Sequence, residues 1–401
     1  MRKLIQSSGD QKVIDTYNEW RDKKYRLAQA YLLTVEERRK QGISLELLED
    51  ECYKLENVLG QTFKIFSDQD KATYHSWQEI SKVLPDSSAI VDIIQYRNYS
   101  VSVVDEQFHQ GFEDQSGYMA FVIKPDSVLK PVKWSIYTDF DKGFTLYKNS
   151  LKYGIRDVNS YDVFWKPLSP HLQDVRKIFF SPDGIFHKLN PVIFYDEHRD
   201  MYVMDEYDII NITSGKDLIY QQSKRLSRDA RIFGNPNFSK LNLETPLVQL
   251  PGAEREAADV TGILDVRRWD TESFYFDNAT EENVKKLNNP GVVHIATHGY
   301  FKDDVNNVDP LHSSGLFLSR DETTGNDGLL SAYEAMNLIL DETSLVVLAA
   351  CETGLGTIKN GEGVFGLQRA FLVAGAENVL ISLVKINDQA ARTFMNIYYN
   401  E

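Results

Sequence analysis

Two segments near the end of the chain each join an apolar run to a reactive side chain and a glycine. They read VVHIATHGYF at 292–301 and LVVLAACETGLG at 345–356. A thiol becomes a strong nucleophile only as the thiolate, and an imidazole within hydrogen-bond reach is the usual base that forms it. His298 and Cys351 therefore have the chemistry of a base and a nucleophile for cleaving peptide bonds.

The flanking residues indicate how the chain would hold such a pair. The short apolar runs are typical of strands buried in a parallel sheet, and open α/β sheets place their ligands beyond the carboxyl ends of strands. Gly299 follows His298 directly and Gly354 lies just beyond Cys351, so the backbone can turn at both places. The two reactive residues are 53 positions apart, close to the separation of about 50 seen in caspases.

Other chemistries fit the same residues less well. A cysteine phosphatase would need Arg at position 357, which is Thr, and the run GLGTIKNGEG at 354–363 lacks the ending of a phosphate-binding loop. No HExxH or CxxC motif is present, so we predict no metal site and no cofactor. We expect His294 to be a packed or surface histidine. The turn-rich stretch 302–331 lacks the ligand spacing of a calcium loop and is interpreted as a flexible loop beside the cleft.

Longer segments extend the pattern beyond these two strands. The chain resembles the CHAT family, a group of caspase- and separase-like cysteine peptidases often joined to tetratricopeptide repeats. The resemblance rests on HIATHG, ACETGLG, GEGVFGLQRAFLVAGAENVLISLV, SPDGIFHKLNPVIF, GNPNF and LPGAEREAADV, and it extends from about residue 75 to 399.

The resemblance implies a role for several residues. His298 would be the general base and Cys351 the nucleophile, with the backbone N–H groups of Gly299 and Cys351 forming an oxyanion hole. Acidic residues often receive a basic P1 side chain in this clan, and the candidates by position are Asp388, Glu352 and Glu362. Val384 stands where many members of the family carry Trp, so we expect a different pocket wall. An apolar P1 residue remains an equal alternative.

We expect an α/β fold in three parts. Residues 1–86 form an N-terminal helical segment, 87–228 an inactive caspase-like α/β unit, and 229–401 the active caspase-like unit with a mostly parallel sheet flanked by helices. Apolar residues at helical spacing predict helices over 12–33, 44–62 and 72–84, with Cys52 in the core of the helical layer.

Further elements follow from the same patterns. The first α/β unit should have strands at 89–99 and 118–126 with an exposed hairpin tip at 103–117, strands near 132–137, 176–181 and 200–205, and helices near 140–152 and 156–174. In the second unit, strands around 292–296, 345–350 and 378–384 should be neighbours, and a helix should follow at about 362–374.

Composition limits the class of protein. The formal charge of −15 disfavours general binding to nucleic acid. Two cysteines in 401 residues give no disulfide framework, and the start MRKLIQSSGDQK has no apolar signal segment. No apolar run approaches the length of a membrane span, so we expect a soluble cytoplasmic protein without membrane contact.

Two functional classes remain. The first is a regulated cysteine endopeptidase that performs limited proteolysis of a protein partner, by analogy a gasdermin-like effector in bacterial antiphage defence or cell death, under a repeat domain or activating subunit. It includes an enzyme held inactive until it is activated. The second is a catalytically silent scaffold that only binds a partner protein, although a scaffold has no need to keep both His298 and Cys351.

Overall fold

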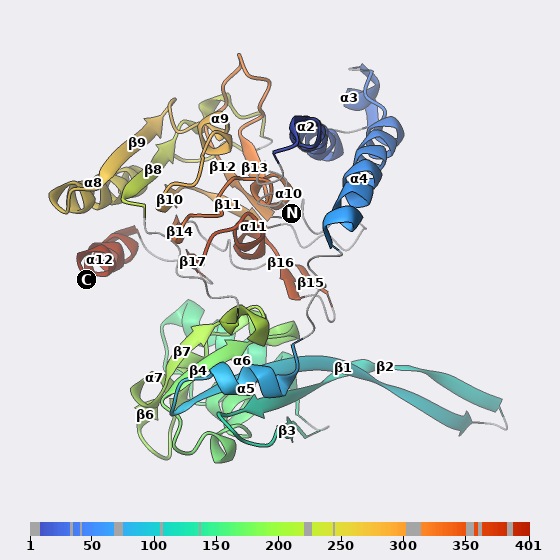
Figure 1. Cartoon of the computed structure of the whole chain (residues 1–401). Coiled ribbons are helices and arrows are strands. Elements are labelled where there is room, and N and C mark those ends of the chain that lie inside the picture. Colours follow the sequence, from blue (N-terminus) through green and yellow to red (C-terminus); the bar gives the residue numbers. More distant parts are fainter. Residues whose placement is uncertain are drawn as a thin grey trace. The chain divides into compact units, whose positions relative to one another are not determined.

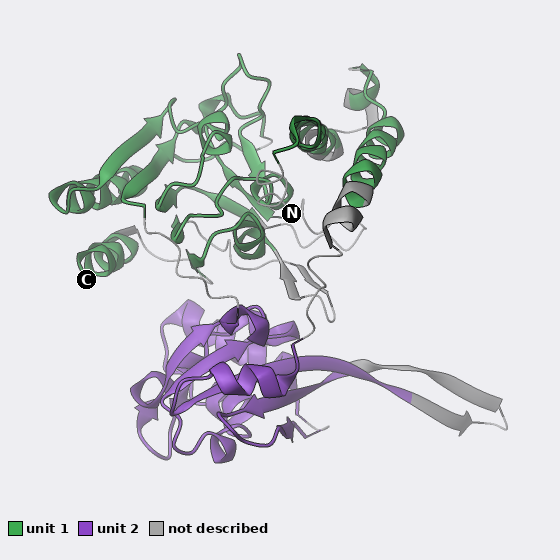
Figure 2. Cartoon of the chain, in the orientation of Figure 1, with its two compact units in different colours: residues 1–73, 224–357, 365–401 green, residues 74–223, 358–364 purple. Residues whose placement is uncertain are grey.

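The computed structural model (Figure 1) describes most of the 401 residues. The described residues are 9–32, 35–40, 42–67, 75–104, 107–135, 138–219, 227–243, 245–301, 314–349, 357–359, 363–382 and 388–401. The chain forms two compact units (Figure 2): residues 1–73, 224–357 and 365–401 make up unit 1, and residues 74–223 and 358–364 make up unit 2.

Unit 1 is built on a five-stranded sheet with the order β17-β14-β10-β8-β9. Its strands are β8 (Asp229–Pro236), β9 (Asp270–Phe276), β10 (Val292–Ala296), β14 (Leu345–Ala349) and β17 (Asn378–Ile381). Every pairing between neighbours is parallel. The predicted parallel sheet with three adjacent strands is therefore confirmed, whereas β9 was not expected from the sequence.

Helices cover both faces of this sheet, as Figure 1 shows for α8 and α12 on one side and α11 on the other. They are α8 (Pro251–Val266), α9 (Glu281–Lys285), α10 (Ala332–Ala335), α11 (Leu367–Val373) and α12 (Asp388–Asn400). Side chains alternate along a strand, so Val293 and Ile295 join the core cluster of α9, α10 and α11. Val292 joins the opposite cluster with α8 and α12.

A smaller antiparallel sheet follows directly after β10. It consists of β11 (Gly299–Phe301), β12 (Ser314–Phe317) and β13 (Leu329–Ser331) in that order. The interpretation of 302–331 as one flexible loop was wrong for its later part. Leu316 and Leu330 are fully buried, and their burial in the core of unit 1 holds strands β12 and β13 in place. Residues 302–313 lie outside the described part.

The N-terminal helices belong to unit 1. They are α2 (Gln11–Leu32), α3 (Val35–Lys40) and α4 (Leu45–Ser67). Val13 and Tyr17 of α2 pack with Leu59 of α4 in a small core of their own, and Cys52 is buried as expected. Ion pairs from Lys23 to Glu51 and from Lys24 to Glu56 also join the two helices.

Unit 2 contains a mixed sheet with the order β3-β2-β1-β4-β7. The strands are β1 (Ser88–Val104), β2 (Gln107–Ile123), β3 (Lys130–Lys133), β4 (Lys177–Ser181) and β7 (Asp208–Asn211). Strands β1, β4 and β7 pair in parallel, while β2 and β3 add antiparallel strands at the other edge. The predicted hairpin tip at 103–117 was too long, since β1 continues to 104 and β2 begins at 107.

The other elements of unit 2 are short, apart from α6 (Phe140–Tyr153). They are α5 (Trp77–Val83), η1 (Tyr161–Trp165), η2 (Ser169–His171), η3 (Gly184–Lys188), η4 (Pro191–Ile193), β5 (Tyr195–Asp196), β6 (Met201–Tyr202), α7 (Val203–Glu206) and η5 (Gly215–Leu218). The helix predicted over 156–174 was wrong: one π-helical and one 3₁₀ turn replace it because Pro167 and Pro170 cannot continue a helix. The predicted strand at 200–205 is only β6, followed directly by α7.

Three further elements of the described chain complete the list. They are η6 (Phe238–Lys240) and the paired strands β15 (Thr357–Lys359) and β16 (Gly363–Phe365). The helix expected at 362–374 is α11, which begins only at Leu367 because β16 occupies the first residues. No helix in the described part of the chain is long and apolar enough to cross a membrane.

Candidate active site

The two candidate catalytic residues follow neighbouring strands at the same level of the sheet. Ala296, the last residue of β10, pairs with Ala349, the last residue of β14. His298 and Cys351 each come two residues later in the chain. His298 is described, whereas Cys351, Glu352 and Glu362 lie outside the described residues. The two strands that precede these residues therefore end side by side at the carboxyl edge of the sheet.

The His298 ring is held by contacts from the segment after β8. Its Nε2 lies 2.8 Å from the backbone oxygen of Val248, and its ring centroid lies 5.0 Å from that of Phe238. A carbonyl oxygen can only accept, so Nε2 must carry the hydrogen of this bond. In the neutral ring, the lone pair is then on Nδ1, which becomes the basic nitrogen of His298.

A buried asparagine organises the segment that carries Val248 and Phe238. Asn235 has a φ of +49°, which asparagine tolerates better than most residues. Its Oδ1 accepts the Leu250 N–H at 2.6 Å, and its Nδ2 donates to Glu254 Oε2 at 3.1 Å. Asn235 thereby ties the end of β8 to the start of α8, next to the Val248 carbonyl.

The backbone N–H of Gly299 faces away from β12. The Phe317 N–H donates to the His298 carbonyl oxygen at 2.9 Å, and Gly299 pairs with Leu316. Hydrogen-bonded and non-hydrogen-bonded pairs alternate along an antiparallel ladder, so the Gly299–Leu316 pair is of the second kind. The Gly299 amide is thus not used by the ladder, as an oxyanion donor requires.

The candidate P1-reading residue Asp388 begins helix α12. This helix is fixed to α8 by Arg392, which donates to both oxygens of Asp259 at 2.6 and 3.1 Å. The Asn396 amide also donates to Asp259 at 3.1 Å. Side-chain hydrogen bonds, chiefly the one from Arg392, lower the pKa of Asp259. These hydrogen bonds therefore hold α12, the helix that Asp388 begins, against α8.

His294 lies in the core, away from His298. It is fully buried on β10, with Nε2 3.1 Å from Glu256 Oε1 and Nδ1 3.2 Å from the Tyr399 hydroxyl. In the neutral ring, the carboxylate accepts from Nε2, and Nδ1 then accepts from Tyr399. The pKa of Tyr399 is raised by burial, which keeps that hydroxyl protonated. His294 is the packed histidine that the sequence led us to expect.

The sheet order and the helices on both faces define an α/β protein with a mostly parallel sheet, as in a caspase-like fold. A model of the family described as "CHAT domain" matches residues 159–401, more than half of the chain. The chain therefore belongs to the CHAT family. It is also similar to human tetratricopeptide repeat protein 28, with 25% identity over 263 residues that cover 56% of this chain. The match spans only 10% of that much longer protein.

Proposed function

We propose that this protein is a cysteine endopeptidase that cuts specific protein partners by limited proteolysis. Cys351 would be the nucleophile and His298 the general base. The observation that carries the proposal is the pairing of Ala296 with Ala349, two residues before each of them. Adjacent strands lie about 4.8 Å apart, so loops leaving them at the same level can bring a thiol and an imidazole into contact.

The hydrogen bond to Val248 supports a specific course of reaction. The His298 Nδ1 takes the Cys351 thiol proton, and the thiolate adds to the scissile carbonyl carbon. The imidazolium then gives that proton to the leaving amine as the C–N bond breaks, which leaves a thioester on Cys351. Water, deprotonated by His298, hydrolyses the thioester and releases the new carboxyl terminus and the free thiol.

Backbone and acidic groups complete the proposed site. The Gly299 amide, free of the β11–β12 ladder, would donate with the Cys351 amide to the oxyanion of the tetrahedral intermediate. Asp388, Glu352 and Glu362 are the proposed groups for a basic P1 side chain. A carboxylate in the pocket would favour Arg or Lys over apolar residues there.

The biological setting is proposed by analogy alone. A cytoplasmic protease must be restrained, so we propose control by a repeat domain or an activating subunit. The human relative is named as a tetratricopeptide repeat protein, which agrees with control by a repeat domain. By the same analogy, the substrate is a gasdermin-like or other effector protein in bacterial antiphage defence.

The test compares the wild-type chain with Cys351→Ala on a peptide library that varies P1. Cleavage by the wild type that vanishes in the variant supports the protease and reveals its P1 preference. Labelling of Cys351 by an electrophilic probe without cleavage identifies an enzyme that awaits its activator. If neither labelling nor cleavage occurs, the proposal fails and the protein is better described as a partner-binding scaffold.

A further inference from the structure

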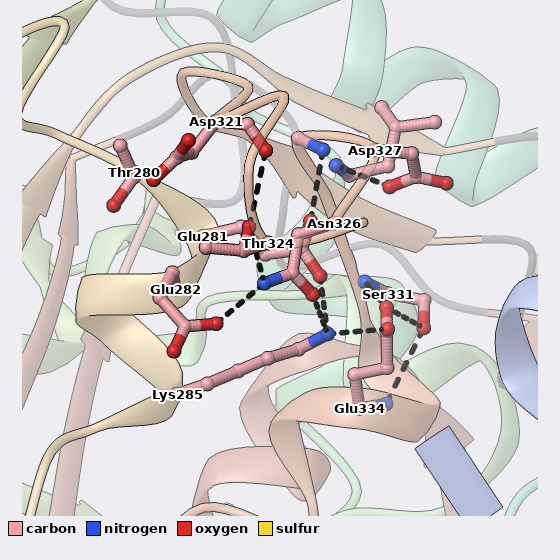
Figure 3. A network of polar contacts seen from close by, with 12 residues as sticks. Thr280, Glu281, Glu282, Lys285, Asp321, Thr324, Asn326, Asp327, Ser331 and Glu334 are labelled. Atoms are coloured by element: carbon pink, nitrogen blue, oxygen red, sulfur yellow. Dashed lines mark hydrogen bonds and ion pairs between the residues drawn. The ribbon is translucent and has the colours of Figure 1, made fainter. Parts of the chain in front are cut away.

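A buried charge cluster joins α9, the segment before β13 and the start of α10 (Figure 3). The Lys285 ammonium is paired with Glu281 and lies 2.9 Å from Glu334 Oε1. Both carboxylates are fully buried, and the lysine side chain is only 11% exposed. Although burial opposes the charge on the lysine, Glu334 and Glu281 together raise the pKa of Lys285. We call these three residues the Lys285 cluster.

The Lys285 cluster holds the connection from β12 to β13 at two points and the last residue of β13 at a third. Lys285 Nζ donates to Asn326 Oδ1 at 3.0 Å, and the Gly328 N–H donates to Glu281 Oε2 at 2.8 Å. Gly328 has a φ of +85°, which suits glycine there. At the start of α10, the Ser331 N–H donates to Glu334 Oε2 at 3.0 Å. Moving the cluster would therefore move both ends of β13.

The β12–β13 pair in turn holds the His298 peptide. The Phe317 N–H bonds the His298 carbonyl, and the Thr297 hydroxyl donates to the Phe317 carbonyl. Tyr300, two residues after His298, packs against Gly315 so closely that a Cβ there would meet its hydroxyl at 2.6 Å. Burial, followed by the charges of Glu334, Asp327 and Glu281, raises the pKa of Tyr300.

The N-terminal helix α2 covers the cluster. Lys285 Nζ lies 4.8 Å from the centre of the Tyr25 ring, close enough for a cation–π interaction. The neighbouring Lys24 lies 5.8 Å from the ring of Tyr333 on α10. Burial, opposed by Lys285, raises the pKa of Tyr25 to about 12, so the residue covers the ammonium as a neutral ring.

We propose that Tyr25 is a positioning residue for His298. By covering the Lys285 ammonium, it stabilises the cluster that fixes β12 and β13, and these strands hold the His298 peptide. A role in catalysis rests on the proposed peptidase function. The structural link from Tyr25 through the Lys285 cluster to the His298 peptide does not depend on that function. A regulatory partner that binds the N-terminal helices would therefore affect the position of His298 through α2.

The test uses the whole chain with Tyr25→Leu and Tyr25→Phe. Phenylalanine keeps the aromatic face over Lys285, whereas leucine keeps apolar volume without it. Amide hydrogen exchange is measured over 298–301 and 314–331, together with the rate at which iodoacetamide alkylates Cys351. Met395→Ala, which opens a cavity in the core on the opposite face of the main sheet, is the control for general destabilisation. If Tyr25→Leu does not fold, Tyr25→Met replaces it, since methionine adapts to irregular spaces.

We expect Tyr25→Leu to raise exchange at 298–301 and 314–331 about tenfold or more and to slow alkylation. Tyr25→Phe should match the wild type, and Met395→Ala should leave alkylation unchanged. Exchange that rises only within α2, or equally over β8 and β9, would overturn the inference even if Cys351 is reactive. Increased exchange at 298–301 in a protein whose Cys351 never reacts would instead uphold the link and refute the peptidase.

Discussion

Ala296 and Ala349 are register partners at the ends of two adjacent parallel strands, β10 and β14. The chain therefore leaves the sheet at the same level on its way to His298 and to Cys351. A shift of either strand by one residue would turn every side chain to the other face and separate the two exits. The buried apolar side chains of both strands, such as Val293 and Val346, fix this register.

Asn235 should support His298 through the segment that carries the Val248 carbonyl. Asn235→Gly keeps the positive φ but removes the hydrogen bonds to Leu250 and Glu254. We expect a loss of about 1–3 kcal/mol in the free energy of unfolding and slower cleavage. Val248→Ala is the control, because the Val248 side chain is 77% exposed and only its carbonyl touches His298. Equal effects of the two changes on cleavage would contradict this role.

Lys285 and Lys286 give a matched pair on one helix. Lys285→Met leaves the Glu334 carboxylate buried without its cation and removes a polar partner of Glu281, which should cost about 3–5 kcal/mol. Lys286 is 67% exposed and pairs with Glu282 at 3.2 Å, so Lys286→Met should cost less than about 1 kcal/mol. Urea unfolding measures both. A Lys285→Met variant as stable as Lys286→Met would show that the cluster contributes nothing to stability.

Stability should fall as the pH rises because of Glu281. Burial and the Glu334 charge raise its pKa from 4.5 to about 8 against the pull of Lys285. Between these two values the folded state binds the proton that the unfolded state has lost, so the free energy of unfolding decreases as pH increases. Urea unfolding at several pH values from 5 to 8 should show this slope. Glu281→Gln cannot titrate and should have a smaller slope, and an unchanged slope would refute the assignment.

The buried His294 should matter for stability but not for catalysis. Tyr399→Phe removes the hydroxyl that His294 Nδ1 accepts from, which should cost about 1–3 kcal/mol. The adjacent Tyr398 is 40% exposed, and Tyr398→Phe should change stability by less than about 0.5 kcal/mol. Neither change should alter peptide cleavage at 25 °C. If Tyr399→Phe folds but no longer cleaves peptides, the prediction is wrong and His294 contributes to catalysis.

The sequence was most informative where strands are buried on both faces. The apolar runs of β10, which is interrupted only by His294, and of β14 predicted their place and their adjacency. Strand β9 was missed because the first four residues of its sequence, DTESFYF, are polar, and it lies at the edge of the sheet. The stretch 302–331 contains many turn residues, which concealed the two short strands β12 and β13.

The supporting contacts of the candidate site could be predicted only in part. The spacing of Glu281 and Lys285 suggests a helical ion pair, yet such pairs are usually exposed, and only the fold shows that this one is buried. Ser331 and Glu334 form a capping box that the sequence pattern does suggest. The Val248 carbonyl is a backbone group, so no residue type in the sequence could have identified it as the partner of His298.

The most direct test of the dyad measures how fast iodoacetamide alkylates Cys351 near pH 6.5 in the wild type and in His298→Ala. The chain has only two cysteines, and Cys52 is an internal control because it is 2% exposed and burial raises the pKa of its thiol. Peptide mass spectrometry assigns each label. We predict that Cys351 reacts at least about tenfold faster in the wild type than in the variant, while Cys52 stays unlabelled in both. Equal rates at Cys351 in the two proteins would show that His298 does not activate this thiol.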